Sequence, residues 1–81
     1  MQLDILTPEK KLYSGEASSV SLPGTDGRFQ VLNNHAPLIS SLKAGLIKYK
    51  TAAGETQLNA KEGFVEVLKN KVTVLLEGVV Q

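Results

Sequence analysis

In five segments of this chain apolar side chains recur at every second position, and this spacing restricts its possible folds more than any other feature. Leu3 and Ile5 alternate with polar neighbours, and so do Val20 and Leu22. The same alternation returns in residues 28–31, 47–50 and 71–76. Neighbouring side chains of a β-strand point to opposite faces, so this alternation predicts strands with one buried and one exposed face.

Turn-forming residues separate these segments at short intervals. Thr7-Pro8-Glu9 ends the first segment, because proline lacks an N–H and fixes φ. Residues 23–27 hold two glycines that can adopt positive φ, and Lys69-Asn70-Lys71 is typical of a tight hairpin. Short strands with frequent turns predict an all-β sandwich or barrel, which we expect to form one domain over residues 1–81.

One segment has apolar spacing that also suits a helix. In residues 36–42, Leu38, Ile39 and Leu42 fit a helical face. The segment is too short for its period to distinguish a helix from a strand, so both remain open here.

Composition excludes several classes of protein. Nine basic and eight acidic residues give a net charge of +1, too little for a basic surface that binds nucleic acid. Cysteine is absent, which excludes disulfides and cysteine-ligated zinc or iron–sulfur sites. The first residues carry an acid at Asp4 and no basic start, and no apolar run reaches about 18 residues. We therefore expect neither a signal peptide nor a membrane span.

Residues for catalysis or metal binding are few. His35 is the only histidine, and although Ser40, Ser41 and Asp26 could complete a triad by count, no G-x-S-x-G turn is present. One histidine without cysteine cannot close a zinc site. Residues 24–28 lack the Gly-Lys-Ser/Thr of a phosphate loop and indicate a β-turn. We expect no catalytic residue, no metal and no cofactor.

Several segments are apolar on both faces of the expected strand. They are Leu46-Ile47, Phe64-Val65, Val67-Leu68, Leu75-Leu76 and Val79-Val80. A strand with one solvated face should alternate cleanly, so these runs indicate an outer face that a partner protein covers. The alternative is that they are bulges or strand ends that turn into the core. Both interpretations remain open.

Residues 27–45 predict a stiff protruding corner. The strand around Val31 ends at Asn33-Asn34, a pair that tolerates the left-handed conformation, and Ala36 is forced to be extended by Pro37. A rigid corner loses little entropy on docking, so it suits a contact surface.

These residues resemble the epsilon subunit of the F-type ATP synthase, called delta in mitochondria. The matching pattern is Gly27-x-Phe29-x-Val31-Leu32-x-x-His35-Ala36-Pro37-Leu38, followed by Leu42 and Gly45. Similarity continues in the opening Leu3-x-Ile5-x-Thr7-Pro8 and in residues 63–67 and 72–75. The resemblance spans essentially the whole chain and implies a flattened β-sandwich of about eight to ten short strands.

The resemblance implies a mechanical function. A chain of this family is a non-catalytic rotor subunit that fastens gamma to the ring of c subunits and couples proton-driven rotation to ATP synthesis by F1, which contains alpha and beta. It would lie on the cytoplasmic face of a bacterial inner membrane and touch the membrane only indirectly, through the Fo ring. The alternatives are a stand-alone β-sandwich that binds a ligand or peptide and, last, a small hydrolase.

Carried over by position, the resemblance gives two sets of contact residues. Ring or gamma contacts are expected at Asp26, Gly27, Arg28, His35, Ala36 and Pro37. Arg28 departs from the family, which often has a small or acidic residue there. The apolar surface toward gamma is expected at Val65, Val67, Leu76 and Val79.

The family commonly continues into two C-terminal helices that inhibit the enzyme. The sequence stops at Gln81, where these helices would begin, so we expect the chain to lack inhibition by them.

Overall fold

The computed structural model describes residues 1–80, and within that range every regular element is a β-strand. Gln81, at which the helical pair was expected to begin, lies outside the described residues. The strands are β1 (Gln2–Leu6), β2 (Lys11–Glu16), β3 (Ser19–Gly24), β4 (Gly27–Leu32), β5 (Leu38–Leu42), β6 (Gly45–Thr51), β7 (Gly54–Ala60), β8 (Gly63–Leu68) and β9 (Lys71–Leu76). The prediction of an all-β fold is confirmed.

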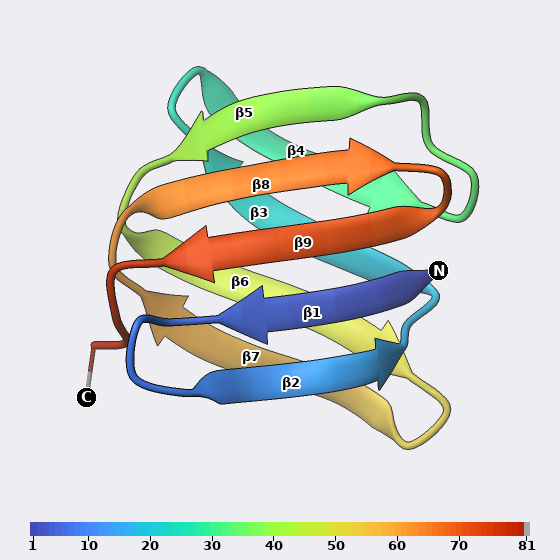
Figure 1. The fold of residues 1–81 in the computed structure, drawn as a ribbon, viewed down its shortest axis with the longest axis horizontal. Helices are drawn as coiled ribbons and strands as arrows, with labels where there is room; N and C mark the ends of the chain where they lie inside the picture. The colour runs from blue at the N-terminus through green and yellow to red at the C-terminus, as the bar shows by residue number, and fades with distance from the viewer. Residues whose placement is uncertain (81) are drawn as a thin grey trace.

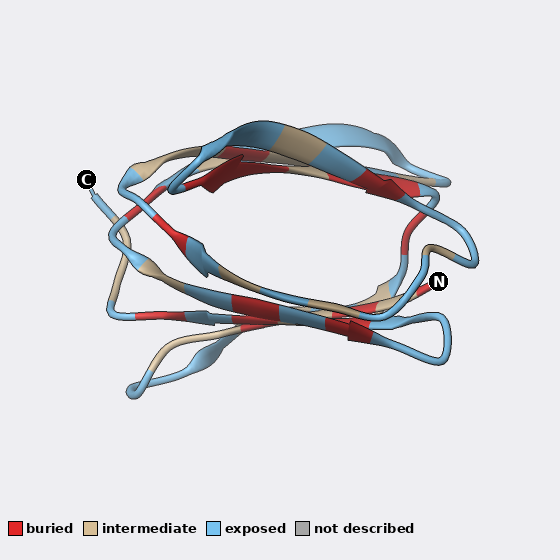
Figure 2. Ribbon diagram, turned by 90° about the horizontal axis from the view of Figure 1, so that it is seen from above, coloured by how far each residue is buried: buried red, intermediate tan, exposed pale blue. Residues whose placement is uncertain are grey.

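The strands form two facing layers. Hydrogen bonds join them in the order β2-β1-β9-β8-β5-β3-β6-β7, with β4 added beside β3. The step from β5 to β3 rests on one residue pair, Gly24 with Leu42, and the sheet folds over at that point (Figure 1). One layer is therefore β2-β1-β9-β8-β5 and the other is β4-β3-β6-β7 (Figure 2). With extents of 29 × 28 × 19 Å, the domain is the flattened sandwich that the resemblance implied.

Strand pairing is antiparallel except between β1 and β9. These two strands run parallel, with Leu3 beside Val72 and Ile5 beside Val74. The strand at the start of the chain thus lies between β2 and the last strand, inside its layer rather than at an edge.

The core lies between the layers and is built from the alternating positions of the sequence. Its large, fully buried side chains are Leu3, Ile5, Leu22, Ile47, Val20, Val31, Val65, Val67, Val72 and Val74. Burying each such aliphatic side chain stabilises the fold by about 1.5–3 kcal/mol relative to leaving it exposed. Figure 2 shows that both layers contain buried segments.

The turns follow the chemistry of their residues. Lys69 and Asn70 have φ of 51° and 59°, as expected for a two-residue hairpin turn between β8 and β9. Asn34 also adopts positive φ, at 63°, where the corner after β4 begins. The segment left open between helix and strand forms β5, because pairing with β8 from Leu38 to Leu42 satisfies its backbone. Within residues 1–80 there is no helix long and apolar enough to cross a membrane.

Candidate functional site

The two layers present very different outer faces. We call the outward side chains of β5, β8 and β9 the apolar face, on which the large exposed residues are Ile39, Phe64, Leu68 and Leu75. We call the outward side chains of β4, β3, β6 and β7 the polar face, which carries Arg28, Gln30, Ser19, Ser21, Lys48, Lys50, Glu55 and Gln57. Leu32 is the one large exposed apolar residue on the polar face.

Strand register gathers the apolar side chains. Phe64 on β8 lies opposite Leu75 on β9, and they are 59% and 50% exposed. Ile39 on β5, one row away, is 76% exposed. Beside Phe64 and Leu75 is a hollow of about 450 Å³ that Pro8 and Leu42 also line. Exposed apolar groups gathered in this way are typical of a protein-binding surface.

The structure corrects the residues predicted to form the apolar surface. Val65, Val67 and Leu76 are only 1%, 2% and 3% exposed, and they point into the core. Val79 is half-buried, pairs with Ala60 and lies outside the apolar face. In each of these apolar pairs one residue points inward and its neighbour outward, so the exposed apolar side chains of β8 and β9 are the neighbours of the predicted residues.

The corner after β4 is fastened to two other segments. The side-chain Oδ1 of Asn70, in the β8–β9 turn, accepts a hydrogen bond from the backbone N–H of Asn34 at 2.8 Å. The amino group of Met1 donates to the Oδ1 of Asn33 at 2.5 Å and to the carbonyl of Ala17 at 3.0 Å. The corner is therefore held by contacts from other segments, and the sequence did not predict these contacts.

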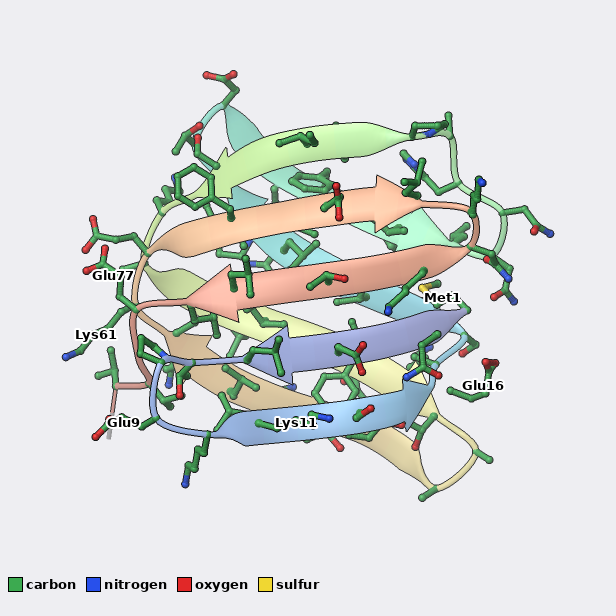
Figure 3. The ribbon with its side chains drawn as sticks, viewed as in Figure 1. Met1, Glu9, Lys11, Glu16, Lys61 and Glu77 are labelled. Carbon is green, nitrogen blue, oxygen red and sulfur yellow. The ribbon has the colours of Figure 1, made fainter. Side chains whose placement is uncertain are left out.

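The residues of the corner itself make local bonds. His35 donates its backbone N–H to the carbonyl of Leu32 at 3.2 Å, and its ring Nδ1 lies 2.7 Å from the carbonyl oxygen of Ala36. Ala36 and Pro37 are exposed. Met1 and Glu16, which form an ion pair of 3.3 Å, lie at the same end of the fold (Figure 3).

The other predicted contact residues lie at the far end of β4. Asp26 and Gly27 are exposed in the turn between β3 and β4, where Gly27 has φ of 132°. The guanidinium of Arg28 donates to the hydroxyl of Ser21 at 3.1 Å and to its carbonyl at 3.3 Å, so it lies along the polar face. The structure thus separates the two predicted groups by the length of β4, about 20 Å for six residues.

Charged groups elsewhere form only small networks. The hydroxyl of Ser14 donates to Asp4 at 2.6 Å, and this hydrogen bond is the largest cause of the lowered pKa of that carboxyl. Burial opposes the lowering of the pKa, whereas Gln2, Lys71 and Lys11 add to it. Across residues 1–80 no three acidic or histidine side chains lie close enough together to hold a metal ion. Glu9, Lys61 and Glu77 lie together at the end of the fold away from Met1 (Figure 3).

Comparison with known sequences gives a consistent result. Residues 1–81 match the family model described as ATP synthase, Delta/Epsilon chain, beta-sandwich domain. The ATP synthase epsilon chain of Chlorobium limicola is 43% identical over 79 residues, which cover 96% of this chain and 90% of the relative. The ATP synthase epsilon chain of Desulforapulum autotrophicum is 47% identical over 77 residues, which cover 94% of this chain and 57% of the relative. The chain thus spans nearly all of one relative and little over half of the other.

Two solved structures share the fold. A chain in the central stalk and c-ring of the Tetrahymena thermophila mitochondrial ATP synthase superposes with a TM-score of 0.85 at 14% identity, covering 99% of this chain and 65% of that one. A chain in the OSCP/F1/c-ring structure of the Euglena gracilis mitochondrial ATP synthase gives a TM-score of 0.89 at 17% identity, covering 96% of this chain and 51% of that one.

Proposed function

The chain belongs to the family of ATP synthase delta and epsilon chains, which are non-catalytic subunits of the central stalk, and we propose that it fastens the gamma subunit to the ring of c subunits. In that position it transmits proton-driven rotation to F1, where alpha and beta make ATP. The bacterial origin of its relatives supports a place on the cytoplasmic face of the inner membrane, reached through the ring.

The apolar face is the proposed gamma contact. The observation that carries this assignment is the exposure of Ile39, Phe64 and Leu75 on adjacent strands of one face. A stable contact of this kind buries about 1,200–2,000 Å² in total. Val65, Val67 and Leu76 support the face from below through the core.

The corner and the β3–β4 turn are the proposed contacts to the ring or to gamma. Exposed backbone and small side chains at Asp26-Gly27 and Ala36-Pro37 allow close approach, and both loops are bound to the rest of the fold. Arg28 brings a cation to this set, so we expect its partner group to be an acid or a carbonyl.

A pair of serine substitutions tests the gamma contact. Leu75→Ser on the apolar face should weaken binding of the chain to its gamma subunit by about tenfold or more, because burial of the side chain is lost. Leu32→Ser on the polar face is the matched control, since Leu32 and Leu75 are 54% and 50% exposed. Its binding should match the wild type within about twofold.

The measurement is the Kd for gamma by isothermal titration calorimetry, with thermal unfolding of each variant recorded alongside. Equal losses for both substitutions, or no loss for Leu75→Ser in a folded protein, would contradict the assignment of the apolar face. The stand-alone binding module becomes the better account if the wild-type chain does not bind gamma at all.

A further inference from the structure

A single carboxylate lies in the middle of the apolar face. Glu66 is the central outward residue of β8, with Phe64 and Leu68 two positions away on the same strand. It lies opposite Ile39 on β5 and Thr73 on β9. Glu66 is exposed, so water solvates it in the isolated chain.

Asp4, a second carboxylate in the row of residues that runs across the strands from Ile39 through Glu66 and Thr73, has the polar partners that Glu66 lacks. Asp4, on β1 beside Thr73, accepts hydrogen bonds from Ser14 and Gln2 at 2.6 and 3.1 Å. The ammonium of Lys71 lies 3.8 Å from the same Asp4 carboxylate. Among residues 1–80, Glu66 has neither a hydrogen-bond donor nor an ion-pair partner of its own.

Covering the apolar face would remove water from Glu66. A buried charge without a partner is strongly unfavourable, so a surface that covers Ile39, Phe64 and Leu75 must also neutralise the carboxylate between them. Lys69 and Lys71 line a hollow beside Glu66, but neither forms an ion pair with it, and Lys71 pairs with Asp4 instead. The unpaired carboxylate therefore calls for a cation from the surface that covers it.

We propose that Glu66 determines the specificity of the apolar face, by pairing with a cationic side chain set within an apolar surface of the partner. An arginine fits best, because its planar guanidinium binds a carboxylate through two parallel hydrogen bonds and is weakly hydrated. The apolar residues around Glu66 then provide affinity, and the charge pair fixes the register of docking. This inference rests on the proposed function, in which the partner on this face is gamma.

The test is Glu66→Gln, which keeps the shape of the side chain and removes its charge. If a partner cation pairs with Glu66, the Kd for gamma should rise about 30-fold or more, because the substitution leaves that cation buried and unpaired. Glu55→Gln is the matched control, since Glu55 is an exposed strand residue on the polar face. It should change the Kd by less than about twofold.

The direction of the change decides the inference. Binding that is unchanged or tighter in Glu66→Gln overturns it, because removing an unpaired charge lowers the cost of covering the face. Leu75→Ser separates the two proposals. If Leu75→Ser weakens binding and Glu66→Gln does not, only the charge pair is wrong, whereas if neither variant weakens binding the apolar face is not the gamma contact. Thermal unfolding of both variants should match the wild type, since both side chains are exposed.

Discussion

The two outer faces of this sandwich obey the same rule of strand alternation and yet have opposite chemistry. On the polar face the outward positions of β3 and β6 hold serine and lysine, which are well solvated by water. On the apolar face the outward positions of β5, β8 and β9 include Ile39, Phe64 and Leu75. The difference teaches that the inward residues specify the fold, whereas the outward residues are free to specify a partner.

The comparison is tested most strongly by two neighbours on β9. Leu76 is 3% exposed and Leu75 is 50% exposed, so the same substitution should act on different properties. Leu76→Ala should lower the free energy of unfolding by about 2–5 kcal/mol, because it leaves a cavity in the core. Leu75→Ala should change it by about 0.5 kcal/mol or less. Urea denaturation measures both, and similar losses would mean that the two sides of β9 are not distinct.

The corner links the two layers, because it joins β4, in the layer with the polar face, to β5, in the layer with the apolar face. Asn70→Gly keeps the positive φ of the turn and removes the side chain that binds Asn34, which should cost about 1 kcal/mol. Lys69→Gly, at φ of 51°, is the control without that hydrogen bond and should cost less. Hydrogen exchange at the Asn34 amide should become faster in Asn70→Gly and stay unchanged in Lys69→Gly. If the Asn34 amide of Asn70→Gly is as protected as in the wild type, the hydrogen bond from Asn34 to Asn70 does not hold the corner.

The smallest expected effect is on the acid dependence of stability, and it comes from Asp4, which lies on β1 next to the apolar face. Because its pKa is lowered in the folded state, mainly by Ser14, Asp4 stabilises the fold above its unfolded pKa of about 3.8 and loses that contribution as the pH falls through the folded value. Asp4→Asn should therefore flatten the loss of stability below about pH 4, and Ser14→Ala should flatten it in part. Denaturant titrations at neutral and acidic pH measure this, and an unchanged acid dependence in Asp4→Asn would contradict it.

Much of the fold could be predicted from alternation alone. The alternating pairs Leu3 with Ile5 and Val20 with Leu22 are buried. Val72 and Val74 on β9 are buried too, and they lie beside Leu3 and Ile5. The same alternation already placed Leu76 inside, against its assignment to a partner surface, and the alternation was correct.

The rest of the site could not be predicted because it depends on contacts between distant residues. In Phe64-Val65 both residues are apolar, so the sequence does not say which one points inward until β8 is paired with β5 and β9. The tie from Asn70 to Asn34 joins residues 36 positions apart. The lack of an ion pair at Glu66 likewise depends on the fold, in which the neighbouring Lys71 pairs with Asp4 instead.

The parallel pairing of β1 with β9 has a consequence for how the protein is made. Leu3 emerges from the ribosome early, and its neighbour Val72 is among the last residues of the strands to be synthesised. Until β9 is available, β1 has no partner on one side and the layer cannot close. The layer therefore closes only after β9 has been translated, and the apolar strands stay exposed to chaperones until then.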